Sequence, residues 1–260
     1  MNNCLHRQHS ICLESSVFME EQIIYGRNAV MEALRSGSAI DTVYVQRGAG
    51  GLGKLIALAK ETGAVVKDAS ADKLDELSAG GKHGGVAAIA AAAEYADVED
   101  ILAVSAEKGT PPFIIIADEI QDPHNLGAII RTAEAAGADG VIIPKRRSAG
   151  LTSTVFKTSA GAASWVKVAR VSNLVETMKQ LKAKGIWIYG AEADGEPFRK
   201  ADLSGPAALV IGSEGNGLGR LVRENCDMIL SIDMYGKINS LNASVSAGIL
   251  MYEIVRGRHS

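Results

Sequence analysis

The second half of the chain alternates short, almost wholly apolar segments with helix-like ones, and this alternation constrains the fold most strongly. The apolar segments are PFIIIADEI, GVIIP, WVKVARV, IWIYGAEA, AALVIGSE and MILSIDM. Strands that are apolar on both faces are typical of a mostly parallel sheet covered by helices on each side. The sequence therefore predicts an α/β fold over residues 112–258, with ligands at the loops beyond the carboxyl ends of the strands.

A smaller α/β unit is expected over residues 20–95. NAVMEALRSG, LGKLIALAKETG and ASADKLDELSAGG have helical periodicity, whereas TVYVQ, AVVKDA and GVAAIAA are typical of strands. Segment 96–111 is acidic, then small and polar, and ends in Pro-Pro, which is the composition of a linker. Residues 1–18 are polar and lack a fold pattern, so we expect a disordered extension.

Composition excludes several classes of protein. The chain is 47% hydrophobic and 22% charged, as in ordinary globular proteins. No apolar run approaches the roughly 20 residues that span a bilayer, and the N-terminus is too polar for a signal peptide. The three cysteines are few and odd in number, which favours a reducing compartment. We therefore expect a cytoplasmic protein with no membrane partner.

The N-terminal cysteines and histidines do not predict a metal site. Cys4 and Cys12 lie near His6 and His9, but their spacing matches no standard zinc motif. We expect no metal.

The net charge of −3 shows that the protein is not strongly basic overall, as many nucleic-acid-binding proteins are. Contacts with RNA or DNA would have to use local basic patches. An ordinary solvated face explains the same residues equally well. The candidate patch is Lys145, Arg146 and Arg147, with Lys157, Lys167 and Arg170 further along the chain.

GAGGLG, from Gly48 to Gly53, matches the G-x-G-x-x-G fingerprint of dinucleotide-binding proteins. Asp68 follows at about the spacing that the fingerprint requires. However, Gln46 and Arg47 separate the strand from the first glycine, and the unit has too few strands for a doubly wound fold. A flexible glycine-rich loop is the better interpretation, and an NAD-dependent oxidoreductase is the alternative.

Polar residues follow the first apolar strand of the larger unit, in QDPHN. Asn125 is a natural helix N-cap and Pro123 a turn former. In the helix that follows, Arg131 lies opposite the apolar face of Leu126, Ile129 and Ile130. Helix geometry alone does not distinguish a solvated arginine from a functional one.

Two further segments carry polar residues after apolar strands. GSEGNGLG contains four glycines, which let the backbone approach a ligand closely, and one charge, Glu214. It is not a P-loop, because no Gly-Lys-Ser/Thr follows. In INSLNASVSAGILMYEIV, Ser240 and Asn242 stand where they could cap the last helix.

Taken together, these segments resemble the SpoU (TrmH-like) family of RNA ribose 2′-O-methyltransferases. The first family motif resembles DEIQDPHNLGAIIRTAEAAGADGVII, the second LVIGSEGNGLGRLVRENCD and the third ILSIDMYGKINSLNASVSAGILMYEIVR. The first unit, from YGRNAVMEAL to KHGGVAAI, is similar to the small ribosomal-protein-like RNA-binding domain of one branch. That branch methylates a guanosine of 23S large-subunit rRNA.

The resemblance implies a SPOUT fold with a deep trefoil knot, an exception to the usual unknotted chain. It also implies an obligate homodimer that binds S-adenosylmethionine (SAM) in the knot and transfers its methyl group to RNA. The residues implied to hold SAM are Gly212, Ile232 and Leu241. The implied catalytic or structural polar residues are Asn125, Arg131, Glu214, Ser240 and Asn242.

One residue departs from the family pattern: Asp233 stands where the family usually has proline, beside the expected adenosine site. Arg131 is expected to act at the ribose 2′-hydroxyl, either by stabilising negative charge or as a base. Electrostatic stabilisation is the better interpretation, because the pKa of a free arginine exceeds about 12. The same chemistry on tRNA and a non-catalytic RNA-binding protein are the alternatives.

Overall fold

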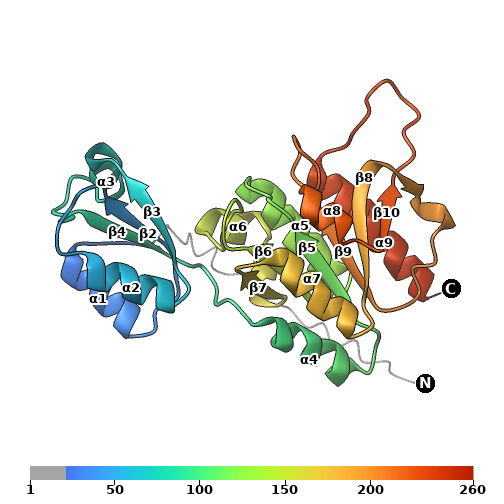
Figure 1. Ribbon diagram of the computed structural model, residues 1–260, viewed down its shortest axis with the longest axis horizontal. Coiled ribbons are helices and arrows are strands. Elements are labelled where there is room, and N and C mark those ends of the chain that lie inside the picture. Colours follow the sequence, from blue (N-terminus) through green and yellow to red (C-terminus); the bar gives the residue numbers. More distant parts are fainter. Residues whose placement is uncertain (1–21, 260) are drawn as a thin grey trace, which may run out of the picture.

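The computed structural model describes residues 22–259, which form two α/β domains (Figure 1). The expected extension 1–18, with Cys4, Cys12 and the nearby histidines, lies outside the described residues. The small domain contains strands β1 (Ile23–Tyr25), β2 (Ile40–Gln46), β3 (Val65–Ala69) and β4 (Val86–Ala90), and helices α1 (Arg27–Arg35), α2 (Gly53–Glu61) and α3 (Ala71–Leu77).

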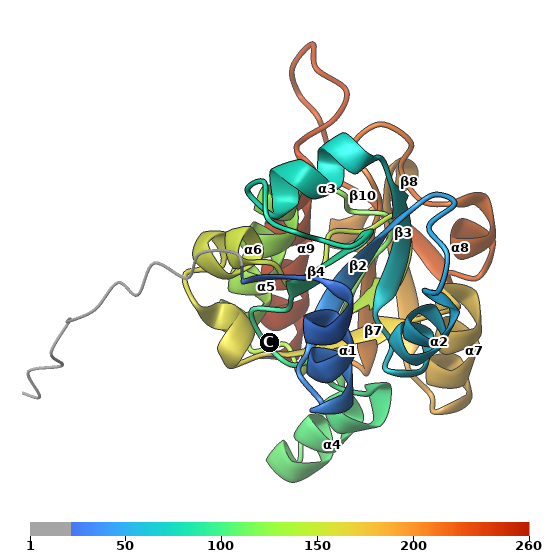
Figure 2. The same ribbon diagram turned by 90° about the vertical axis from the view of Figure 1, so that its left-hand side faces the viewer.

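The small domain is built on a mixed sheet in the order β1-β4-β2-β3. Only β2 and β3 are parallel, and β4 is antiparallel to both of its neighbours. Helices α1 and α2 cover one face of this sheet, and α3 packs on the other (Figure 2). A mixed four-stranded sheet is not a dinucleotide-binding fold, so GAGGLG serves as the turn from β2 into α2.

The large domain contains the predicted parallel sheet. Its six strands lie in the order β10-β8-β9-β5-β6-β7, and every adjacent pair is parallel. The strands are β5 (Phe113–Ala117), β6 (Gly140–Pro144), β7 (Lys167–Val171), β8 (Trp187–Pro197), β9 (Ala207–Ile211) and β10 (Met228–Ser231). The helices are α4 (Val98–Lys108), α5 (Pro123–Ala135), α6 (Ser153–Thr158), α7 (Leu174–Ala183), α8 (Arg220–Glu224) and α9 (Ala243–Arg258), with short 3-10 helices η1 (Ala162–Ser164) and η2 (Phe198–Lys200).

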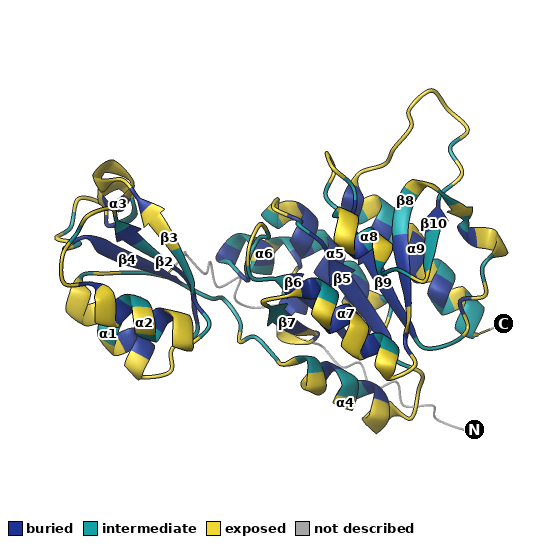
Figure 3. Cartoon of the chain, viewed as in Figure 1, coloured by how far each residue is buried: buried dark blue, intermediate teal, exposed yellow. Residues whose placement is uncertain are grey.

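Helices cover both faces of this sheet because its central strands are apolar on both sides. Along β5, Phe113 and Ile115 point into a core shared with α5, α6 and α9, whereas Ile114 and Ile116 point into a core shared with α4, α7 and α8. Figure 3 shows β5 and its neighbours buried between exposed helix surfaces. The three-layer arrangement leaves the carboxyl ends of the strands free to form a site.

The segment expected to be a linker contains helix α4 instead. Asp97 caps this helix in a reciprocal capping box with Asp100, and Gly109 ends it with a left-handed φ of 64°. Ile101 is fully buried, and Gly140 of β6 lies so close that a Cβ there would be 2.5 Å from the Ile101 side chain. The acidic composition reflects a capped helix N-terminus, and α4 belongs to the large domain.

The two domains meet at a buried ion pair between Asp41 of β2 and Arg170 of β7. The Nη1–Oδ1 distance is 2.7 Å, and the two side chains are only 8% and 6% exposed. Tyr95, in the connection between the domains, donates from its hydroxyl to Asp41 at 2.6 Å, and its ring lies 4.1 Å from the Arg170 guanidinium carbon. Arg170 was predicted to belong to a basic surface patch, and that prediction is wrong because its charge is used inside the protein.

Among residues 22–259, no helix is long and apolar enough to cross a membrane.

Candidate active site

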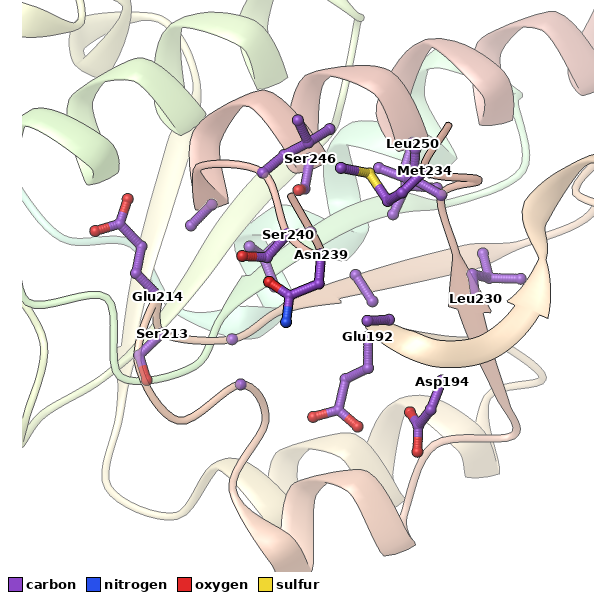
Figure 4. Close-up of a pocket in the computed structure, with 18 of the residues that line it drawn as sticks. Glu192, Asp194, Ser213, Glu214, Leu230, Met234, Asn239, Ser240, Ser246 and Leu250 are labelled. Carbon is purple, nitrogen blue, oxygen red and sulfur yellow. The ribbon is translucent and has the colours of Figure 1, made fainter. Parts of the chain in front are cut away.

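A cavity of about 440 Å³ opens at the carboxyl ends of β8, β9 and β10 (Figure 4). In this view Ser213 and Glu214 lie on one side, and Leu230 and Met234 lie on the other. The loop that connects β10 to α9 returns over the end of β9 and adds Asn239, Ser240 and Leu241 to the lining. The cavity is therefore built from segments that are far apart in the sequence.

A tight glycine turn after β9 forms one rim of this cavity. Ser213 and Gly217 exchange backbone hydrogen bonds of 3.0 and 2.9 Å. A Cβ on Gly212 would lie 2.3 Å from the Gly217 backbone, and Gly217 itself has a φ of +63°. Only glycine fits both positions. The turn presents backbone rather than side chains to whatever fills the cavity.

Acidic side chains fix the far end of the glycine turn. Glu192 of β8 accepts a 3.0 Å hydrogen bond from the backbone N–H of Leu218 and forms an ion pair with Arg223 of α8. Arg223 also binds Asp194 through both of its terminal nitrogens at 3.0 Å. Glu192 and Asp194 line this side of the cavity together with Arg223, which offsets one of their two negative charges.

Asp118, at the carboxyl end of β5, stabilises the end of the same turn. It follows β5 and accepts a 2.8 Å hydrogen bond from the backbone N–H of Gly219. Burial raises the pKa of Asp118, although this hydrogen bond opposes the shift.

Three polar side chains from three strand ends meet beside the cavity. Asn125 Nδ2 donates to Glu214 Oε1 at 3.0 Å, and Asn242 Nδ2 donates to Asn125 Oδ1 at 2.9 Å. Asn242 Nδ2 also donates to the same oxygen of Glu214, which closes a triangle. The sequence places these residues 89 and 117 positions apart from Asn125. We call this set the Asn-Glu-Asn cluster.

The local sequence explains how the two asparagines are held. Asn242 is the N-cap of α9, as predicted, because its Oδ1 accepts from the backbone N–H groups of Ser244 and Val245. Asn125 was predicted to cap α5, and that prediction is wrong. Asp122 is the cap, accepting from the backbone N–H of His124, and Pro123 is the first helical residue. Asn125 therefore lies inside the first turn, where its buried amide is available to the cluster.

The structure brings most of the predicted site residues together. Gly212, Ile232 and Leu241, which were expected to hold SAM, line the cavity with Ser240 and Glu214. Arg131 does not line it. It lies roughly 9 Å, or somewhat less than two helical turns, along α5 from Asn125, and its exposed side chain bonds to no other described residue. Asp233 is exposed between Ile232 and Met234, which do line the cavity.

Sequence reasoning missed the contribution of β8. This strand runs to Pro197, beyond the predicted IWIYGAEA, and its late residues Glu192 and Asp194 are part of the wall. An acidic pair after an apolar strand was a usable signal, because ligands bind at that edge of the sheet.

Among residues 22–259, no group of three or more His, Cys, Asp or Glu side chains is arranged to hold a metal ion. Cys226 packs against the core shared with α4, α7 and α8, and burial raises the pKa of its thiol to about 12. That thiol stays protonated at neutral pH.

Comparison with known proteins identifies the class to which this fold and site belong. Residues 112–252 match the SpoU rRNA methylase family, and residues 23–96 match the family of RNA 2′-O ribose methyltransferase substrate-binding domains. The chain belongs to the SpoU family of RNA methyltransferases.

Particular relatives support this membership over nearly the whole chain. The Bacillus subtilis protein named "Putative TrmH family tRNA/rRNA methyltransferase YacO" is 46% identical over 92% of this chain and 97% of its own length. The SpoU methyltransferase AviRb from Streptomyces viridochromogenes is 27% identical, with a TM-score of 0.59 over 92% of this chain and 90% of AviRb. AviRb has also been solved in complex with the cofactor AdoMet, so SpoU methyltransferases of this fold bind SAM.

Proposed function

We propose that this protein transfers a methyl group from SAM to a ribose 2′-hydroxyl of RNA, at a guanosine of 23S rRNA. The observation that carries the proposal is the Asn-Glu-Asn cluster. Three motif segments converge there at the rim of one cavity, each from a different strand end. The small domain, which matches the substrate-binding family, supports RNA as the substrate.

The cavity fits SAM in size and chemistry. Its glycine turn leaves room for a ligand to approach the backbone, and Leu230, Leu241 and Leu250 supply apolar surface for an adenine ring. Glu192 and Asp194 provide carboxylates for ribose hydroxyls and for a cationic group. Bound SAM would supply the methyl group. We further propose that the chain is knotted here, because the loop after edge strand β10 returns over the end of the inner strand β9.

Arg131 lies outside the cavity of its own chain, so we propose that it acts in a homodimer, on the cavity of the partner. Two observations support a dimer at α5 and α9. These helices pack side by side, and α9 exposes an apolar row at helical spacing. The row is Val245 (49% exposed), Ile249 (37%) and Tyr252 (53%).

The proposed chemistry needs positioning and charge stabilisation. Holding the hydroxyl in line with a methyl donor can supply roughly 7–11 kcal/mol of the barrier. The bond from the ribose oxygen to the methyl carbon would form as the sulfur–carbon bond breaks, with the bonding pair returning to sulfur as a neutral thioether. The hydroxyl proton would pass to solvent water, and Arg131 would stabilise the negative charge that develops on the oxygen. The Asn-Glu-Asn cluster orients the ribose and fixes the first turn of α5.

The decisive experiment is Arg131→Ala. Transfer of a radiolabelled methyl group from SAM to rRNA should fall by about 10²–10³-fold, in line with the loss of one charge-stabilising group. SAM affinity by calorimetry and the oligomeric state should be unchanged, because the proposed role of Arg131 arises only in the transition state and the proposed dimer contact is the apolar row of α9. Near-normal turnover would overturn the role of Arg131.

Arg35→Ala, which removes an exposed arginine from α1 of the small domain, is the matched control. Mapping 2′-O-methyl groups in RNA from cells with and without the gene identifies the target. Loss of a methyl group from tRNA rather than rRNA would contradict the proposed substrate, and no lost methyl group together with no SAM binding would favour a non-catalytic RNA-binding protein.

A further inference from the structure

A second cavity, of about 530 Å³, lies between the two domains. One wall is the face of the small sheet that α3 leaves partly open, and the other is the segment from Pro144 to Thr154 of the large domain. We call this cavity the interdomain cleft. It is distinct from the cavity beside the Asn-Glu-Asn cluster and shares none of its lining residues.

The small-domain wall combines an aromatic ring with apolar side chains. Thr42 and Tyr44 point from β2 toward the cleft, and their partners across the strand pair are Val65 and Lys67 of β3. Ile89 of β4 completes this wall. The Lys67 ammonium lies 6.0 Å from the Tyr44 ring centroid. The Tyr44 ring is partly buried against the core under α3, and its remaining surface faces the cleft. An aromatic ring on a sheet beside a cation is a surface on which a nucleic acid base stacks.

The large-domain wall is cationic. Lys145, Arg146 and Arg147 follow β6 and all line the cleft. Arg147 is balanced by Glu119 at 2.9 Å, whereas exposed Arg146 forms no ion pair with any other described residue. An unpaired guanidinium in the lining of this cationic wall suits a phosphate group, which it can bind through two N–H groups.

The buried pair of Asp41 and Arg170 forms the floor of the cleft. Their charges cancel, so the positive charge of Lys67, Lys145 and Arg146 is not offset by another acidic side chain of the lining. Arg170 also donates to the backbone oxygen of Gly63 at 3.0 Å, which ties β7 to the small domain at a second point. The cleft therefore exists before any ligand binds, and little ordering energy is lost on binding.

The cleft adjoins the proposed active site through the start of α5. Gln121 and Pro123 line the cleft, and Asn125 of the Asn-Glu-Asn cluster follows two residues later. Neighbouring nucleotides of one RNA strand could thus occupy both places.

We propose that the interdomain cleft binds one unpaired nucleotide of the substrate RNA, with its base on Tyr44 and its phosphate at Arg146. The proposal rests on the proposed function and assigns it a substrate class: the target lies in a single-stranded region, because a base inside a duplex cannot reach the ring. The cleft then selects where along the RNA the active site acts.

The experiment uses the full chain and a 12-nucleotide single-stranded RNA carrying 5-iodouridine, with its blunt duplex as comparison. We expect the single strand to bind at least tenfold more tightly than the duplex in fluorescence anisotropy. Photocrosslinking followed by mass spectrometry should locate the crosslink in the peptide containing Tyr44. Arg146→Ala and Tyr44→Leu should each lower affinity for the single strand about tenfold, with SAM affinity unchanged.

Arg35→Ala is again the matched control, since it removes the same charge from a helix on the other face of the small sheet. Tyr44→Leu also touches the core beneath α3, so its fold is checked by circular dichroism, while exposed Arg146 tests the cleft without that complication. Wild-type affinity in Arg146→Ala, or crosslinks confined to other peptides, would overturn the cleft assignment. RNA bound in the cleft, together with no transfer of a methyl group to rRNA by the wild-type protein, would instead overturn the proposed function alone.

Discussion

Two polar clusters join distant parts of this chain, and they differ in their relation to solvent. The cluster of Asp41, Tyr95 and Arg170 is closed: both charged side chains are more than nine-tenths buried, and each satisfies the other. The Asn-Glu-Asn cluster is open. Glu214 and Asn242 are exposed, and of the two carboxylate oxygens of Glu214 only Oε1 accepts hydrogen bonds from described residues.

This difference indicates that the first cluster has a structural role and that the second can bind a ligand. A buried ion pair that is complete within the protein fixes the position of two domains and has no capacity for a ligand. A cluster that keeps unused acceptors at the edge of a cavity can still bind one. Substitutions at Asp41, Glu214 and Asn242 test this contrast, in order of decreasing effect, and a substitution at Asp118, which belongs to neither cluster, is expected to have the smallest effect.

The largest effect is expected from Asp41→Ala. It leaves the Arg170 charge buried without a partner, so the free energy of unfolding should fall by about 3–5 kcal/mol. Urea denaturation measures this loss. The double variant Asp41→Leu with Arg170→Met removes both charges and should recover most of the stability. Equal losses in the single and double variants would show that the pair does not act as a unit.

Glu214→Ala should lower methyl transfer about 10²-fold, since a misplacement of 1 Å at an active site can cost that much. The free energy of unfolding should change by less than about 1 kcal/mol, because the carboxylate is exposed. Steady-state kinetics and thermal unfolding on the same samples give both values. Glu214→Gln keeps the Oε1 acceptor and should retain more activity. A loss of stability as large as that of Asp41→Ala would make the cluster structural.

Asn242 has two roles that can be separated. Asn242→Ala should cost about 1 kcal/mol of stability through loss of the α9 cap. Asn242→Asp keeps the cap oxygen but replaces the Nδ2 donor with a negative oxygen beside Glu214. It should therefore keep the contribution of the cap to stability, reduced by the repulsion between two exposed carboxylates, and lose methyl transfer. An active Asp variant would mean that the donor is not needed at the site.

Asp118→Asn is expected to have the smallest effect, and its sign is stabilising. Because burial raises the pKa of Asp118, the folded state binds a proton more readily than the unfolded state, whose pKa is near 3.8. Stability is thus lost as pH rises from 3.8 through the folded-state pKa, and the ionised group costs stability at pH 7. Asparagine keeps the acceptor for Gly219. The melting temperature should rise at pH 7, with a gain that shrinks toward pH 4; a constant gain would point to packing instead.

Much of the fold could be predicted from the sequence because periodicity is a local property. The apolar strands of the large domain and its last helix occur where the pattern indicated. The short strand β1 was missed, since three residues carry too little pattern, and α4 was hidden by an acidic composition that suits both a linker and a helix start.

The site was harder to predict, because its side chains depend on contacts between distant segments. Asn125 and Arg170 illustrate the difficulty. Asn125 was a reasonable capping residue on local grounds, but Asp122 is the N-cap of α5. Arg170 was a reasonable surface charge, but it forms a buried ion pair with Asp41, which lies 129 positions away. Family resemblance supplied the roles that local pattern could not, and those roles remain predictions until the variants are measured.

The segment between the domains has a practical consequence for dividing this protein. Ala92 donates its backbone N–H to Leu151, Ala96 donates to Val168, and the Tyr95 hydroxyl accepts from Leu151. A fragment that starts at Pro112 would lose these bonds together with the whole of α4. The sheet residues that pack with Ile101, among them Ile114 and Ile142, would then be exposed to water. The large domain should therefore be expressed alone, or fused to another RNA-binding domain, from a boundary near residue 91.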